Sequence, residues 1–158
     1  PFVLGDWEVI DKTLKLLGSA LRLRSVKEIK KDNKKEKVIN LLALSKLNPD
    51  QVSFGKPNRD TSDAMVGYIK KAIHLALEKK IDGMVTCPIN KAAMALAGYT
   101  YPGHTELLAE ETNTKEYAMM LAGKRLKVVL VTIHLPLRSV TEVLSSEKVF
   151  SCIYLSHN

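Results

Sequence analysis

Residues 128–138 read VVLVTIHLPLR, and the class of fold follows most directly from them. The first four are an unbroken apolar run that is mostly β-branched, a pattern that favours a strand buried on both faces. His134 comes where we expect this strand to end, and Pro136 then turns the chain. Because ligands of parallel α/β sheets bind at the carboxyl ends of strands, His134 is the first candidate functional residue.

A second segment, YPGHTE at residues 101–106, predicts a loop that becomes a helix reaching about Asn113. The backbone N–H groups of a helix start suit an anionic group such as a phosphate or a carboxylate. His104 and Thr105 add an imidazole and a hydroxyl there. The alternative is that Thr105 is only a helix cap and His104 only a loop residue.

The other segments alternate strand and helix signals, so we expect an α/β fold: a three-layer αβα domain with a mixed sheet. Residues 1–158 would form a single partial α/β domain. Strands are predicted at residues 2–4, 20–26, 38–44 and 82–86, with the last of these buried, and a hairpin at residues 117–122 and 126–133. Helices are predicted at residues 7–17, 60–80, 90–97 and 145–155.

Composition excludes several classes of protein. The chain has 158 residues, of which 46% are hydrophobic and 26% charged, as in ordinary globular domains. No apolar run approaches the roughly 20 residues of a membrane span, and we expect no membrane partner. Cys87 and Cys152 are too few and too far apart for a zinc knuckle or a disulfide framework. They fit a reducing compartment, so we expect a cytoplasmic protein.

The net charge of +7 raises the question of nucleic acid, and six lysines fall within residues 27–37. Acids interrupt this run and it holds no aromatic residue for base stacking, so we interpret it as a solvated loop and expect no nucleic-acid partner. The alternative is a basic nucleic-acid-binding domain. It predicts a salt-dependent gel shift that disappears when four side chains are neutralised, namely Lys30, Lys31, Lys34 and Lys35.

Four segments in the same order and spacing resemble the 4-hydroxythreonine-4-phosphate dehydrogenase family of vitamin B6 biosynthesis. They are DGMVTCPINK at residues 82–91, YPGHTE at 101–106, MMLA at 119–122 and TIHLPLR at 132–138. A weaker similarity extends over residues 1–158. The resemblance implies a fold like those of the isocitrate and isopropylmalate dehydrogenases. Cys87 departs from the family pattern, in which a small residue such as glycine or alanine is common.

The resemblance also implies a reaction. NAD would oxidise the C3 hydroxyl of 4-phosphooxy-L-threonine, and loss of CO2 would give 3-amino-2-oxopropyl phosphate. A divalent metal (Zn, Mg or Co) would be held by three histidines, of which His134 is one and the other two lie beyond Asn158. His104 and Thr105 would contact the phosphorylated hydroxy amino acid. Lys91 would pair with its phosphate or carboxylate, or else be a surface lysine. The family forms homodimers with active sites at the subunit interface.

Members of the family begin with a further strand and a glycine-rich loop and continue well beyond residue 158. We therefore expect this chain to be part of a longer protein, without the C-terminal NAD-binding part and without turnover of its own. No Gly-x-Gly-x-x-Gly motif follows a strand, so a Rossmann-type NAD site is not indicated. The nearest alternative is a paralogous dehydrogenase of a phosphorylated four-carbon sugar acid, and nothing in residues 1–158 separates the two activities. Asn90 and Arg138 also stay open as site residues.

Overall fold

The computed structural model describes residues 1–29, 37–101 and 103–157. It consists of two compact units, Pro1–Thr112 and Asn113–Asn158, and each is described by itself. The four lysines of the nucleic-acid alternative lie outside the described residues, as does Pro102. That residues 1–158 form a single partial domain stays a prediction.

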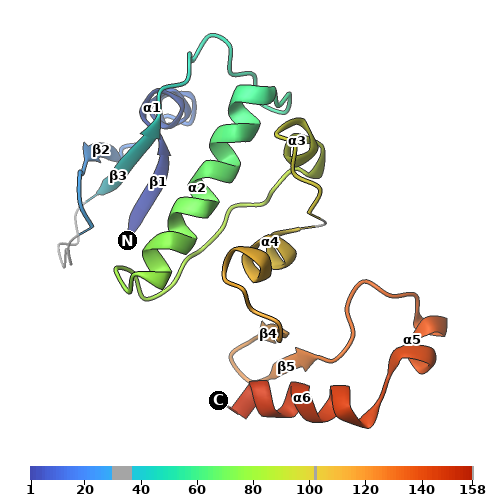
Figure 1. Ribbon diagram of the computed structural model, residues 1–158. Coiled ribbons are helices and arrows are strands. Elements are labelled where there is room, and N and C mark those ends of the chain that lie inside the picture. Colours follow the sequence, from blue (N-terminus) through green and yellow to red (C-terminus); the bar gives the residue numbers. More distant parts are fainter. Residues whose placement is uncertain (30–36, 102, 158) are drawn as a thin grey trace. The chain divides into compact units, whose positions relative to one another are not determined.

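The first unit contains a parallel sheet of three strands in the order β1-β3-β2 (Figure 1). The strands are β1 (Phe2–Asp6), β2 (Arg22–Ser25) and β3 (Val38–Ser45). β3 lies in the middle, and its Leu41 is fully buried. These strands confirm the three that were predicted first along the chain. Both pairings are parallel, which requires crossover connections and excludes hairpins between these strands.

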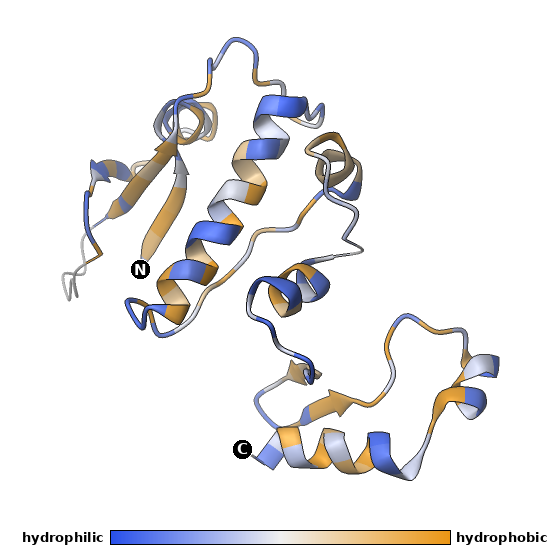
Figure 2. Ribbon diagram, viewed as in Figure 1, coloured by the Kyte–Doolittle hydropathy of each residue, from blue (hydrophilic) through white to orange (hydrophobic). Residues whose placement is uncertain are grey.

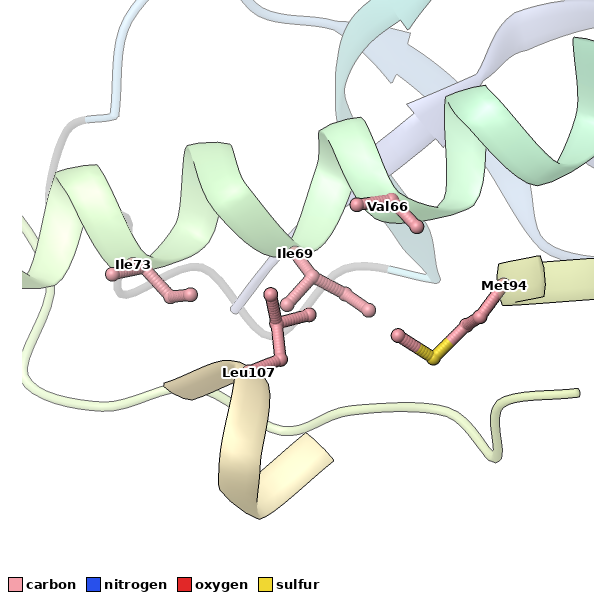
Figure 3. Close-up of a cluster of buried hydrophobic side chains, with 5 residues drawn as sticks. All are labelled: Val66, Ile69, Ile73, Met94 and Leu107. Carbon is pink, nitrogen blue, oxygen red and sulfur yellow. The ribbon is translucent and has the colours of Figure 1, made fainter. Parts of the chain in front are cut away.

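Four helices complete this unit: α1 (Trp7–Leu16), α2 (Arg59–Leu77), α3 (Lys91–Leu96) and α4 (His104–Glu111). α2 contacts β1 and β3, and it also contacts α3 and α4. A hydrophobic core joins α2, α3 and α4, and Figure 3 shows its side chains converging between these helices. Its members are Val66, Ile69 and Ile73 of α2, Met94 of α3 and Leu107 of α4. This core decides where α4 lies, because Met94 and Leu107 are both fully buried against the same helix.

The start of α2 is fixed by a reciprocal cap. The Asn58 side chain accepts a hydrogen bond from the Thr61 backbone N–H at 2.9 Å, and the Thr61 hydroxyl accepts one from the Asn58 N–H at 2.9 Å. We expect Asn58→Ala to lower the free energy of unfolding by about 1 kcal/mol, because the Thr61 N–H loses its partner. Asn58→Asp should retain most of this stabilisation, because a carboxylate oxygen also accepts the bond from the Thr61 N–H. Urea unfolding of both variants measures the difference, and an equal loss in both would contradict the capping role.

The predicted strand at residues 82–86 is wrong. The structure has no strand there, and Val85 is fully exposed. A strand is stable only when its backbone groups pair with a neighbour, and no described residue pairs with this segment. Its apolar pattern still has a role, because Met84 packs against the core formed by α2, α3 and α4.

The second unit contains an antiparallel pair, β4 (Met119–Ala122) and β5 (Lys127–Leu130), with α5 (Leu137–Val143) and α6 (Ser146–His157). The predicted hairpin is confirmed. The predicted burial of its second strand on both faces is wrong, because Val128 is 39% and Val131 37% exposed. β5 pairs with β4 alone and contacts α6, and so short a unit does not cover two faces of a strand. Cys152 is the only buried residue among residues 113–157.

The mixed α/β character is therefore confirmed, with parallel and antiparallel pairs in separate sheets among the described residues. Apolar residues follow β1, β3 and β5, and they alternate with polar ones along α6 (Figure 2). On α6 they include Phe150, Ile153 and Tyr154, which are all more than half exposed. None of the helices in the described ranges combines the length and the apolar character that crossing a bilayer requires.

Candidate functional site

The start of α4 carries the predicted anion-binding residues. Gly103 precedes the helix in an extended conformation and makes no side-chain cap, and the first helical hydrogen bond, from Leu107 N–H to the Gly103 carbonyl, is long at 3.5 Å. The N–H groups of the first turn have no partners within a helix. The structure thus places His104 and Thr105 in the first turn, as predicted, at a helix end whose positive dipole is not capped by a side chain.

His104 has an unsatisfied polar atom. Its Nε2 is inaccessible and makes no hydrogen bond in the described structure. An inaccessible nitrogen without a partner costs about 1–3 kcal/mol. A ligand oxygen removes this cost only when the imidazole turns and Nε2 becomes accessible. The ligand contact of His104 therefore stays a prediction, beside the alternative of an ordinary residue at the helix start.

The charges around this helix start are mixed. Glu106 lies in the first turn, where its carboxylate stabilises the helix dipole, but it repels an incoming anion. A cation has to compensate for it. Lys91 is exposed at the first position of α3, and α3 packs on the same helix as α4 does. Asn90 has a structural role: its side chain caps α3 by accepting a hydrogen bond from the Ala93 N–H at 3.0 Å.

His134 belongs to the second unit and lies in the loop between β5 and α5. The strand ends at Leu130, so His134 comes four residues after it and not at its end. It is exposed, and its φ angle is +58°. This left-handed backbone conformation costs free energy in a non-glycine residue, and strained residues of this kind are common at functional sites. Pro136 is the N-cap of α5, a helix that the sequence did not predict, and Arg138 lies exposed in that helix.

The fit of a metal to these residues is partial. An exposed imidazole held in a strained loop is a suitable donor for a divalent ion. Three protein ligands are the usual minimum, and no group of three or more His, Cys, Asp or Glu residues lies close enough together within residues 1–29, 37–101 and 103–157. His134 therefore supplies one donor, and the described residues do not form a complete metal site. How His134 lies relative to His104 stays a prediction, because the two belong to different units.

The sequence did not indicate a polar cluster at the carboxyl ends of β1 and β3. Asp6 is 3% exposed, and its carboxylate accepts bonds from Val9 N–H at 3.2 Å, Ser45 Oγ at 2.7 Å and Leu47 N–H at 2.8 Å. Ser45 Oγ also bonds the Tyr68 hydroxyl on α2. Burial alone would raise the pKa of the Asp6 carboxyl, but these hydrogen bonds outweigh it and hold the pKa below its ordinary value. With these acceptors occupied, the cluster is structural.

Comparisons with known proteins agree with the motifs. The family model described as pyridoxal phosphate biosynthetic protein PdxA matches residues 1–158. A 4-hydroxythreonine-4-phosphate dehydrogenase of Trichlorobacter lovleyi is 42% identical over 159 residues, covering 100% of this chain and 47% of that protein. A D-threonate 4-phosphate dehydrogenase of Cupriavidus necator is 37% identical, covering 87% of this chain and 41% of that protein.

The folds agree as well. The crystal structure of a 4-hydroxythreonine-4-phosphate dehydrogenase from Klebsiella pneumoniae superposes with a TM-score of 0.91 at 31% identity, covering 99% of this chain and 47% of that one. The chain thus spans about half the length of the relatives that it matches. With a family match over its whole length and an uncapped helix start at the matching Gly-His-Thr-Glu motif, this chain belongs to the PdxA family.

Proposed function

We propose that this chain forms part of an NAD- and divalent-metal-dependent dehydrogenase that oxidises and decarboxylates 4-phosphooxy-L-threonine to 3-amino-2-oxopropyl phosphate. The observation that carries the proposal is the start of α4, where an uncapped helix end meets the unsatisfied Nε2 of His104. A phosphate or carboxylate oxygen of the substrate would accept bonds from the first-turn N–H groups, and from Nε2 of His104 once the imidazole turns toward it. The name of the T. lovleyi relative supplies the substrate class.

Each residue of the chain then has a stated role. His104 and Thr105 bind the anionic end of the substrate, and Lys91 pairs with its phosphate or carboxylate. His134 is one of the metal ligands, the others lying outside this chain. When bound, the metal (Zn, Mg or Co) stabilises negative charge on the oxygen that is oxidised, and NAD accepts the hydride. The contacts to NAD are also outside this chain.

The wider setting is proposed on the same basis. We propose that residues 1–158 are part of a three-layer αβα domain with the fold of the isocitrate and isopropylmalate dehydrogenases, and that the protein is a homodimer with its active site at the subunit interface. The exposed apolar residues of the second unit support burial by further protein surface. No nucleic-acid or membrane partner is proposed, and a cytoplasmic location stays a prediction from the sequence.

A second candidate substrate is D-threonate 4-phosphate, a phosphorylated four-carbon sugar acid, because the C. necator relative carries that activity in its name. The two substrates share the phosphate, the C3 hydroxyl and the carboxylate, and they differ in having an amino or a hydroxyl group at C2. His104, Thr105 and Lys91 are proposed to contact only groups that both substrates have. Selection between the two substrates therefore depends on other residues.

A chimera tests the proposal. This chain replaces the matching half of the T. lovleyi enzyme, and NADH formation is measured with each of the two substrates. We expect turnover with 4-phosphooxy-L-threonine, and turnover with D-threonate 4-phosphate alone would favour the second candidate. A chimera that melts cooperatively and turns over neither substrate, while the unmodified T. lovleyi enzyme is active, would contradict the proposed function. The isolated chain should form no NADH, because its described residues hold one metal donor of the three required.

A further inference from the structure

The last turn of α4 is tied to α2 by an ion pair. Lys70 Nζ of α2 lies 2.7 Å from Glu111 Oε1, at the last residue of α4. The two side chains are 36% and 28% exposed, so water screens this pair less than it screens a fully exposed one. Leu107, in the preceding turn of α4, is fully buried against the same helix. α4 is thus held on α2 at two points along its length.

The same ammonium group reaches the segment that leads into α4. Lys70 Nζ lies 4.9 Å from the centre of the Tyr99 ring, a cation–π distance. Tyr99 follows α3 and precedes Gly103. Lys70 therefore contacts α4 at its end and, separately, the segment that enters it. The hydrogen bond to Glu111 raises the pKa of Lys70, which keeps the ammonium charged.

Tyr101 extends this network toward the start of the helix. Its ring stacks on that of Tyr99 with centroids 6.1 Å apart and planes 21° apart. The nearby Glu110 carboxylate raises the pKa of Tyr101. The residue that lies two positions before Gly103 thus interacts electrostatically with the last turn of the helix that Gly103 begins.

We propose that Lys70 is a positioning residue for the anion site: by joining Glu111 to Tyr99 it fixes how α4 meets the segment that enters it, and so fixes where the first-turn N–H groups and His104 point. The helix start needs such a restraint. Gly103 gives it no side-chain cap and its first helical bond is long, so local contacts alone leave its direction loosely set. This role rests on the proposed binding of substrate at His104 and Thr105.

Kinetics of the chimera test the role of Lys70. Lys70→Met keeps most of the apolar stem and removes the charge. We expect KM for 4-phosphooxy-L-threonine to rise about fivefold with kcat changed by less than about twofold, the pattern of weakened substrate positioning. Lys70→Arg should restore KM to within about twofold, because guanidinium also pairs with carboxylate and stacks on tyrosine. Lys71→Met is the matched control, since Lys71 is the exposed neighbour on α2, and its KM should not change.

The outcomes separate two failures. If the chimera binds substrate and His104→Ala weakens binding, but Lys70→Met leaves KM unchanged, the positioning role is overturned and the proposed function stands. If the chimera does not bind substrate, or His104→Ala has no effect on binding, the proposed function fails and the positioning role fails with it. Amide hydrogen exchange at Leu107, whose N–H makes the first helical bond of α4, gives a second measurement in the isolated chain. We expect faster exchange in Lys70→Met than in Lys71→Met, and equal rates would overturn the role without any assay of turnover.

Discussion

His134→Ala in the chimera should lower turnover by about 100-fold or more and weaken the binding of divalent metal, because it removes a side chain that binds the metal directly. Loss of a residue that only hydrogen bonds to a metal ligand already costs about 10–100-fold in metal affinity or activity. Excess metal should rescue part of the activity. His104→Ala should leave metal affinity nearly unchanged and raise KM for the substrate by about 10-fold to 100-fold, the value of one hydrogen bond to a charged group. The contrast follows from the strained, exposed loop around His134 and the helix start around His104.

Titration calorimetry with Zn, Mg and Co on both variants measures the difference. His74→Ala is the control, because His74 is exposed on α2 and belongs to neither site, and it should change neither metal binding nor KM. If His104→Ala loses the metal and His134→Ala keeps it, the two roles are reversed. If both variants keep the metal, His134 is not a ligand and its left-handed backbone needs another explanation.

Asp6→Ala should lower the free energy of unfolding of the chain by about 3 kcal/mol. The substitution removes the N-cap of α1, worth about 1 kcal/mol, leaves the part-buried Leu47 N–H without its partner, and leaves the Ser45 hydroxyl with Tyr68 alone, at about 1 kcal/mol for each lost bond. Asp63→Ala is the matched control. Asp63 pairs with Arg59 at 3.8 Å on the surface of α2 and is 52% exposed, so its loss should cost less than about 0.5 kcal/mol.

The effect of Asp6 should also depend on pH. Its pKa is lower in the folded chain than its ordinary value of 3.8, so the folded state favours the ionised carboxylate. Its contribution to stability is fully present above the ordinary value and is lost as the pH falls through the lowered one. The difference in unfolding free energy between the unsubstituted chain and Asp6→Asn should therefore be constant at neutral pH and should narrow below pH 3.8. Urea unfolding over this range measures it, and a difference that stays constant or widens would show that Asp6 is not a low-pKa acceptor.

Most of the helices could be predicted because their signals are local, although α5 was not predicted. Asn90 caps α3 within one turn of the chain. The helix predicted at residues 60–80 lies at Arg59–Leu77, but its cap, Asn58, was not predicted. The Gly-His-Thr-Glu motif at the start of α4 was read correctly because its signal is local as well.

Strands and polar clusters depend on groups far apart in the chain, and there the local pattern did not suffice. Residues 82–86 have a strand's composition, but no described neighbour supplies the backbone partners that a strand needs. Val128 and Val131 have the composition of a buried strand, yet burial depends on what covers them. Asp6 meets Ser45 and Leu47 across 39 and 41 positions, a contact that no short pattern contains.

The candidate site shows the same division. The resemblance of the motifs to a known family singled out His104, Thr105 and His134, because their residue types alone fit ordinary structural roles equally well. The unsatisfied Nε2 of His104 and the left-handed backbone of His134 appeared only with the fold. So did the tie from Lys70 to Glu111 and Tyr99, residues 41 and 29 positions away along the chain. Chemistry belongs to the side chain and can be read one residue at a time, whereas accessibility, strain and partnership arise when distant segments pack together.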